Sequence, residues 1–252
     1  MLGLPTVSLL GLSYVDASLP VLSAHLAAHL SHGDAPLRIF TPNATIAAAA
    51  LHDASLHALL CSADLLLPDG RGVLIASRLA KRPLQHRLPG IEAAEALLPL
   101  CAALRAPVYF LGAAPGVARR AAASWKQRLP DLILAGTHHG YLTAEETPGV
   151  VREIRDSGAR VLLVCLGFPQ QERWICEHTP ALQEIRIAMG LGGSFDVWAG
   201  KVRRAPLPVR HAGLEWLWRT AQRPARIRTL FPALSYFRAA RKAKHADTPV
   251  KI

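Results

Sequence analysis

The chain lacks most features of a secreted, metal-binding or membrane-spanning protein. Its 252 residues include four scattered cysteines with no CxxC pair, and no DxD pair or metal-ligand cluster is evident. This pattern disfavours a zinc site, predicts that no metal is bound, and favours reduced thiols in a cytoplasmic protein. No uncharged apolar run is long enough to cross a bilayer, and the apolar N-terminus has neither a basic stretch nor a small-residue cleavage site. We therefore predict that the chain does not span a membrane.

Acidic residues are almost missing from the last fifth of the chain. Residues 200–252 hold 13 Lys and Arg against two acids, whereas residues 1–199 hold 16 of each, so the net charge of +11 lies in this last part. A neutral body with a basic tail predicts a compact domain followed by an anion-binding appendage. The expected division is a domain over 1–200, an amphipathic appendage over 201–244 and a disordered tail over 245–252.

Apolar runs typical of strands alternate with alanine- and leucine-rich stretches typical of helices. The strands are nearly all apolar, which predicts a mostly parallel sheet with helices on both faces, the α/β class. The predicted strands are Val7–Leu12, Leu37–Phe40, Leu65–Leu67, Val108–Leu111, Leu132–Gly136, Val161–Leu166 and Ile185–Met189. The predicted helices are Leu19–Ser31, Ala44–Cys61, Gly72–Leu79, Ile91–Leu104, Gly116–Arg128, Thr143–Asp156 and Gln171–His178.

Polar or glycine-rich residues follow several of these strands. Ligands of open α/β sheets bind beyond the carboxyl ends of the strands, so these segments predict a site along one edge of the sheet. The glycine-rich segment that starts at Gly112 lacks GxGxxG spacing, so it indicates a loose nucleotide contact or a plain turn rather than a dinucleotide fingerprint. The segments are Thr41–Asn43, Pro68–Gly70, Gly112–Gly116, Gly167–Glu172 and Gly190–Asp196.

Each segment also has an ordinary structural explanation. Asn43 is a typical helix N-cap, and the tripeptide around Asp69 is a common turn. Glu172 suits the first turn of a helix, and Asp196 suits a cap. The adjacent histidines of GTHHGY lack the i,i+4 spacing of helical metal ligands, which favours a surface loop. The residues alone leave both explanations open.

Taken together and in order, eight segments resemble the WecG/TagA/CpsF family of bacterial glycosyltransferases (glycosyltransferase family 26). They extend over most of the chain, and the last three are the most specific. The segments are Thr41–Asn43, PDGRGV, RLPG, FLGAAPG, GTHHGY, LGFPQQERW, GGSFDVWAGKVRRAP and LEWLWRTAQRPARIR.

This resemblance implies a Rossmann-like fold of the GT-E type, with a C-terminal appendage that helps to complete the site. It implies an inverting, metal-independent hexosyltransferase whose UDP-sugar is a donor substrate, with no further cofactor. The acceptor would be a sugar linked through diphosphate to a polyprenol at the inner face of the bacterial cell membrane. Such enzymes build cell-surface polysaccharide. The reactions expected are transfer of N-acetylmannosamine, or of its uronic acid, to lipid-linked N-acetylglucosamine, and transfer of glucose to lipid-linked glucose. Of these, N-acetylmannosaminyl or glucosyl transfer that forms a β-1,4 link is the best prediction.

Carried onto this chain, the family's proposed catalytic base falls on Asp69. Thr41 and Asn43 match positions beside the base or on the acceptor side, and Arg87 matches a basic position near the reacting groups. In a single displacement the base takes the proton of the acceptor hydroxyl as its oxygen attacks the anomeric carbon. Such proton transfer contributes about 10²–10⁴-fold in rate.

The family's donor positions fall on three further residues, Tyr141, Gln171 and Asp196, with Gly112 as a nucleotide contact. With no metal expected, cationic side chains or backbone N–H groups must stabilise the departing diphosphate. Arg87 and the tail residues Arg219, Arg223 and Arg226, which are spaced to share a helical face, are the candidates. The chain departs from the family pattern at His139 and over Leu88–Glu92. These departures affect the predicted identity of the donor and acceptor sugars and leave the predicted reaction class unchanged.

The basic tail predicts a partner as well as a site. Its apolar and basic residues alternate in a way that favours an interfacial helix on an anionic membrane surface. The alternative is an α/β protein that binds nucleic acid through the tail, but the neutral body and the absence of a known binding motif count against it. The sequence leaves the oligomeric state open, with a homo-oligomer as one outcome.

Overall fold

The computed structural model describes residues 3–206, 209, 218 and 231–243. Arg219, Arg223 and Arg226 lie outside the described residues, as does the tail predicted over 245–252. Across the described ranges, no helix combines the length and the apolar character needed to cross a membrane. The division into domain, appendage and tail stays a prediction.

The body is built on one eight-stranded sheet in the order β1-β2-β4-β3-β8-β7-β5-β6. Only the edge pair β1–β2 is antiparallel, and every other neighbouring pair is parallel. The predicted α/β class is therefore confirmed. The strands are β1 (Thr6–Leu9), β2 (Leu12–Val15), β3 (Leu37–Phe40), β4 (Leu65–Leu66), β5 (Val108–Gly112), β6 (Leu134–His138), β7 (Val161–Cys165) and β8 (Ile187–Gly190).

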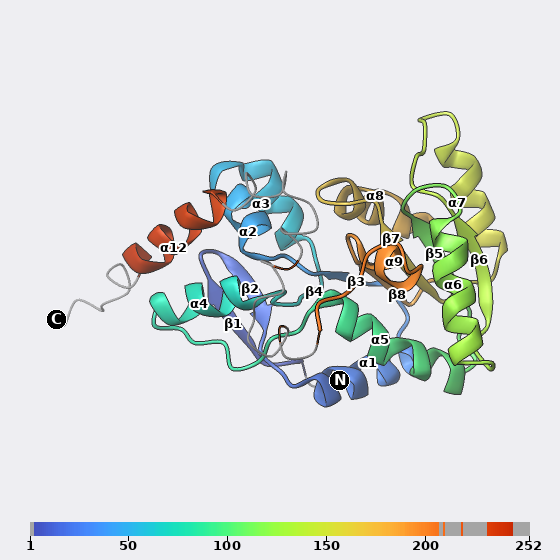
Figure 1. Cartoon of the computed structure of the whole chain (residues 1–252), viewed down its shortest axis with the longest axis horizontal. Coiled ribbons are helices and arrows are strands. Elements are labelled where there is room, and N and C mark those ends of the chain that lie inside the picture. Colours follow the sequence, from blue (N-terminus) through green and yellow to red (C-terminus); the bar gives the residue numbers. More distant parts are fainter. Residues whose placement is uncertain (1–2, 207–208, 210–217, 219–230, 244–252) are drawn as a thin grey trace.

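Helices cover both faces of the sheet (Figure 1). Successive strand residues point to opposite faces, so Val161 and Leu163 of β7 enter one apolar core and Leu162 and Val164 enter the other. The first core is covered by α1 (Leu19–His32), α5 (Gly90–Ala103), α6 (Val117–Arg128) and α9 (Ser194–Trp198). The second is covered by α2 (Ala44–His52), α3 (Ala54–Cys61), α4 (Arg71–Leu79), α7 (Thr147–Asp156), α8 (Gln170–His178) and α12 (Phe231–Ala243).

The first predicted strand is wrong, because Val7–Leu12 contains a tight turn. Leu10 and Gly11 have φ values of 52° and 81°, and β1 pairs with β2 through Leu9 opposite Leu12. Two successive positive φ values are typical of the two-residue turns that match the twist of a hairpin. A leucine is an unusual residue for such a turn, so the apolar sequence indicated one continuous strand.

The helix predicted over Ala44–Cys61 is interrupted at Asp53. This residue is extended, and its Oδ1 accepts hydrogen bonds from the backbone N–H of Ser55 and Leu56 at 2.8 and 3.1 Å. An aspartate that caps the next helix satisfies N–H groups that α3 would otherwise leave unpaired. The alanine-rich pattern is helical on both sides of the cap, which is why the break was not predicted.

The C-terminal segment returns to the body through α12. Figure 1 shows α12 beside α2 and α4, and these helices are in contact. Tyr236 is fully buried with its hydroxyl 3.5 Å from that of Tyr14, and Ser235 Oγ lies 3.2 Å from His52 Nε2. The described part of the basic segment is therefore packed against the sheet domain.

Candidate active site

The parallel strands bring several predicted site residues to one edge of the sheet. Thr41 follows the last residue of β3, Asp69 lies three residues beyond the end of β4, and Gly190 ends β8. These strands are adjacent, since β3 pairs with both β4 and β8. The carboxyl ends of the three strands therefore define the centre of the candidate site.

The chain leaves β3 and β8 toward opposite faces of the sheet. The helix after β3 is α2, which packs into the second core, whereas β8 leads into α9, which packs into the first. Adjacent strands whose connections diverge in this way form a topological switch point, where open α/β sheets bind their ligands. The switch point and the candidate residues thus coincide.

Thr41 and Gln171 both bind the backbone at the end of β8. The Thr41 hydroxyl donates to the Gly190 carbonyl at 3.1 Å, and Gln171 Oε1 accepts from the Gly192 N–H at 2.9 Å. A Cβ on Gly190 would stand 2.9 Å from Gln171 Nε2, so glycine is what permits this approach. Both polar side chains are buried, and they fix the loop that starts the glycine-rich segment.

Two backbone hydrogen bonds hold the residues directly before Asp69. Leu67 N–H donates to the Phe40 carbonyl at 2.9 Å, and Leu88 N–H donates to the Pro68 carbonyl at 3.1 Å. Gly70 follows with a φ of 83° and caps α4, so Asp69 stands directly before the N-terminus of that helix. The half-buried Asp69 is thus placed on a rigid support, as a base requires.

Arg87 lies next to the contact that ties Pro68 to Leu88. Its side chain is 23% exposed, and Nη2 lies 3.4 Å from Glu92 Oε1 at the start of α5. Asn43, by contrast, is the N-cap of α2. Its side-chain oxygen accepts hydrogen bonds from Thr45 N–H and Ile46 N–H at 2.9 and 3.1 Å. The structural reading of Asn43 as an N-cap is correct, and its part in the reaction stays a prediction.

Two predicted donor contacts lie at the ends of other strands. Tyr141 is 69% exposed in the loop after β6, and that loop is tied to the end of β5 by Gly140 N–H, which donates to the Ala113 carbonyl at 2.8 Å. Gly112 has a φ of 130°, and a Cβ there would stand 2.4 Å from the Cys165 carbonyl oxygen. The loops that hold Tyr141 and Gly112 therefore lie at the carboxyl ends of β5, β6 and β7, on one side of the site centre.

Asp196 occupies the first turn of α9. Its Oδ1 lies 3.7 Å from Lys201 Nζ, and its backbone carbonyl accepts from Lys201 N–H and Val202 N–H at 2.9 and 3.0 Å. The residue is therefore attached both to the glycine-rich loop after β8 and to the start of the basic segment. The helix α9 was not predicted, because five residues are too few for a recognisable periodicity.

Two charged features of the site were missed. Glu172 is 1% exposed, its Oε1 accepts from Gln171 Nε2 at 2.8 Å, and burial raises the pKa of its carboxyl to about 7. Arg204, from the basic segment, binds Glu92 and Glu95 on α5. In the sequence, Glu92 and Glu95 are visible as an acidic pair with i,i+3 spacing, and Glu172 as an acid next to Gln171. Neither pattern identifies a contact with a residue far along the chain.

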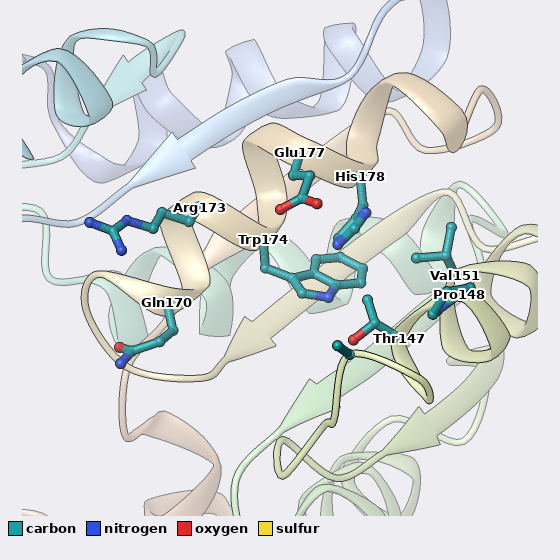
Figure 2. Close-up of a pocket in the computed structure, with 9 residues that line it drawn as sticks. Thr147, Pro148, Val151, Gln170, Arg173, Trp174, Glu177 and His178 are labelled. Carbon is teal, nitrogen blue, oxygen red and sulfur yellow. The ribbon is translucent and has the colours of Figure 1, made fainter. Parts of the chain in front are cut away.

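A shallow groove of about 580 Å³ lies beside this edge, between α7 and α8. Figure 2 shows Trp174 and His178 side by side from α8, facing Thr147, Pro148 and Val151 from α7. None of the predicted site residues lines it, although Gln170 precedes Gln171. Among the described residues no group of three or more His, Cys, Asp or Glu is arranged to hold a metal ion.

The chain is similar to a known protein family and to named relatives. Residues 7–247 match the model of the glycosyl transferase WecG/TagA/CpsF family. A protein of Bacillus spizizenii is 34% identical over 236 residues, 94% of this chain and 91% of the relative, and is named N-acetylglucosaminyldiphosphoundecaprenol N-acetyl-beta-D-mannosaminyltransferase. A Staphylococcus aureus protein (strain MW2) with the same name is 37% identical over 202 residues, 79% of this chain and 78% of the relative. The chain belongs to the WecG/TagA/CpsF family of glycosyl transferases.

Proposed function

We propose that the protein transfers N-acetylmannosamine from UDP-N-acetylmannosamine to N-acetylglucosamine linked through diphosphate to a polyprenol. The observation that carries this proposal is that relatives 34–37% identical, one of them matched over nearly the whole chain, bear the name of this reaction. The polar groups gathered at the switch point of the sheet supply a site for it. The product would be a β-1,4-linked disaccharide for cell-surface polysaccharide.

The proposed reaction is a single displacement. Asp69 takes the proton from the acceptor hydroxyl, whose oxygen forms a bond to the anomeric carbon as the bond to the UDP oxygen breaks. Thr41 and Gln171 act through the loop after β8, which they hold by hydrogen bonds to Gly190 and Gly192. Tyr141 and Asp196 would contact the donor.

The leaving diphosphate gains negative charge that must be stabilised. The proposal assigns this role to Arg87, which directly precedes the Leu88 N–H that binds the Pro68 carbonyl, and adds Arg219, Arg223 and Arg226. A preorganised donor at a developing charge is typically worth about 10²–10³ in kcat. The chain's own side chains and backbone N–H groups supply this stabilisation in the proposal.

The donor is tested by a panel of UDP-sugars. Each is incubated with the full chain and a synthetic prenyl-diphosphate N-acetylglucosamine, and product mass is read by mass spectrometry. The proposal requires a gain of one N-acetylhexosamine residue with UDP-N-acetylmannosamine as the preferred donor. A preference for UDP-glucose would show that the protein is a glucosyltransferase. If no donor gave a product, that result would contradict the proposed reaction.

We also propose that the protein binds peripherally to an anionic membrane, at the inner face of the cell membrane where a polyprenyl acceptor is met. The described part of the appendage supports this, because α12 exposes Arg238, Arg241, Lys242 and the 52%-exposed Leu234. The neighbouring α4 exposes Ile75 and Leu79 beside arginines, and neither helix contains an acid.

This membrane contact has a charge-matched test. Each Lys or Arg near an anionic surface contributes about 1 kcal/mol, so R238Q/R241Q/K242Q should lower vesicle partitioning by about a hundredfold. The control R105Q/R119Q/R120Q removes the same charge from exposed residues away from α4 and α12. Equal loss in both variants, or no loss in either, would refute the assignment to this surface.

The nucleic-acid alternative has no support in these comparisons, because the family match includes most of the basic tail. A homo-oligomer stays a prediction, for which the measurement is molecular mass in solution and on lipid.

A further inference from the structure

The loop that joins α4 to α5 is tied to the end of β2 by one carboxylate. Asp16 directly follows β2, and its Oδ1 accepts from Gln85 N–H and His86 N–H at 2.9 and 3.0 Å. The same oxygen lies 3.1 Å from Nδ1 of the His86 ring. The Asp16 side chain is only 14% exposed, so these bonds are largely shielded from water. Asp16 therefore holds both the backbone and the side chain of His86.

These contacts place His86 at the edge of the sheet that carries the candidate site. Because β2 runs parallel to its neighbour β4, Asp16 leaves its strand at the same edge as Asp69. Two positions after His86, Leu88 N–H donates to the Pro68 carbonyl at 3.1 Å. The loop thus crosses from the end of β2 to the end of β4, and His86 lies beside the support of Asp69.

The predicted donor contacts at Gly112 and Tyr141 lie on the other side of Asp69. They follow β5 and β6, whereas His86 lies at β2, and β4 stands between them in the order β1-β2-β4-β3-β8-β7-β5-β6. In a single displacement the acceptor oxygen attacks the anomeric carbon from the face opposite to the leaving diphosphate. With the donor on the β5 and β6 side, His86 therefore lies on the side left for the acceptor.

The His86 ring has one nitrogen bound and the other one open. An ionised carboxylate only accepts hydrogen bonds, so Nδ1 carries the hydrogen of the bond to Asp16. Nε2 makes no hydrogen bond to any residue in the part of the chain that the structure describes, and the side chain is 44% exposed. A ring that donates from both nitrogens is an imidazolium, and an anion at Nε2 would complete that arrangement.

The segment around His86 is strongly basic within a body that is otherwise balanced in charge. Residues 70–91 contain five Lys and Arg residues and no acid, whereas residues 1–199 as a whole hold equal numbers of acids and bases. The five are Arg71, Arg78, Lys81, Arg82 and Arg87. A concentration of positive charge favours a highly charged anion over a neutral sugar. A diphosphate fits both this charge and the open nitrogen of His86.

We propose that His86, oriented by Asp16, binds the diphosphate of the lipid-linked acceptor. Nε2 donates to a phosphate oxygen, and this bond holds the acceptor sugar beside Asp69. His86 is then a binding residue, and Asp16 is a positioning residue that acts through it. The inference rests on the proposed function, in which the acceptor is a prenyl-diphosphate sugar. The UDP donor also carries a diphosphate, so the test must separate the two ligands.

The test measures the binding of geranyl diphosphate and of UDP to the full chain by calorimetry. H86N keeps an amide N–H at the position of Nδ1 for the bond to Asp16, but has no group at the position of Nε2. It should bind geranyl diphosphate about tenfold to a hundredfold more weakly, because one hydrogen bond between charged groups is lost. UDP affinity should stay within about twofold of wild type. In transfer assays KM should rise for the acceptor and not for the donor.

D16N separates the positioning role of Asp16 from its support of the loop. Its amide oxygen still accepts from the two backbone N–H groups, but the charge beside the ring is lost. We expect geranyl diphosphate affinity to fall about threefold to tenfold in D16N. The double variant D16N/H86N should bind no more weakly than H86N, since Asp16 acts only through the ring. Losses that add would show that Asp16 is merely structural.

H32N is the matched control. His32 is an exposed residue that ends α1, and because α1 leads from β2 to β3 this end lies at the opposite edge of the sheet. H32N removes an imidazole by the same substitution and should leave the affinities for geranyl diphosphate and UDP unchanged. If H86N folds poorly, D16N carries the test, and wild-type binding of geranyl diphosphate by D16N would then overturn the proposal.

Three outcomes would overturn this acceptor site: no binding of geranyl diphosphate by wild type, wild-type affinity in H86N, or an equal loss of UDP affinity in H86N. The last result would assign His86 to the donor instead. Because binding is measured without transfer, the proposed function is judged separately. A wild type that binds geranyl diphosphate through His86 but transfers no sugar would contradict only the reaction. Transfer that is equally efficient in wild type and H86N would contradict only this site.

Discussion

The buried carboxyl of Glu172 makes the stability of the protein depend on pH in a definite direction. Its Oε1 accepts from Gln171 Nε2, and its Oε2 has no hydrogen-bond partner among the described residues. Burial raises the pKa from 4.5 to about 7, because the charged form is poorly solvated there. Between pH 4.5 and 7 the folded protein therefore binds more protons at this group than the unfolded chain does.

The sign and size of the effect follow from proton linkage. Well below pH 4.5 the Glu172 carboxyl is protonated in both the folded and the unfolded state, so it does not change the free energy of unfolding. As pH rises from 4.5 to about 7, the group lowers the free energy of unfolding. Each tenfold change in proton affinity corresponds to 1.36 kcal/mol, so the total loss is about 3 kcal/mol. Glu172→Gln cannot ionise, and its side chain keeps an oxygen for the bond from Gln171. This variant should lack that part of the pH dependence.

Urea unfolding at pH 5, 6, 7 and 8, followed by tryptophan fluorescence, measures the difference between wild type and Glu172→Gln. We expect the variant to gain about 2.5 kcal/mol relative to wild type from pH 5 to pH 8, because part of the loss already occurs below pH 5. Glu184→Gln, which removes an exposed carboxylate outside α8, should leave the wild-type pH dependence unchanged. Parallel pH curves for wild type and Glu172→Gln would refute the reasoning.

Further substitutions test the geometry of the strand ends. Thr41→Val keeps the shape but removes the donor to the Gly190 carbonyl, and should lower the free energy of unfolding by about 1–2 kcal/mol in urea titrations, whereas no change would mean that the bond is not formed. Gly112→Ala would place a Cβ 2.4 Å from the Cys165 carbonyl oxygen, so a loss above about 3 kcal/mol is expected in thermal unfolding. Gly116→Ala is its control, because a Cβ there meets nothing closer than 3.6 Å and only the positive φ costs about 1–2 kcal/mol; equal losses in the two variants would contradict the steric account.

The parts of the fold that could be predicted are those encoded locally. Uninterrupted apolar strands such as β5 and β7 are buried on both faces, and their composition predicts a parallel sheet covered on both sides. The Leu10–Gly11 turn was missed because a leucine seldom adopts a positive φ. The cap at Asp53 was missed because helical sequence continues on both sides of it.

The candidate site divides in the same way. Thr41, Asp69 and Gln171 follow strand ends, and parallel topology brings strand ends together, so their convergence at one edge was predictable. The approach of Arg204 to Glu92 joins residues 112 positions apart, and nothing in either local sequence indicates it. The ionisation of Glu172 likewise depends on burial, which is a property of the assembled core.

We propose that this chain transfers an N-acetylhexosamine with Asp69 as the base. The most direct measurement compares wild type and Asp69→Asn in single-turnover transfer from UDP-N-acetylmannosamine to prenyl-diphosphate N-acetylglucosamine. Both proteins should unfold at the same urea concentration. The variant should transfer sugar at least about a hundredfold more slowly, since it cannot accept the hydroxyl proton. Transfer by Asp69→Asn at close to the wild-type rate would contradict the account.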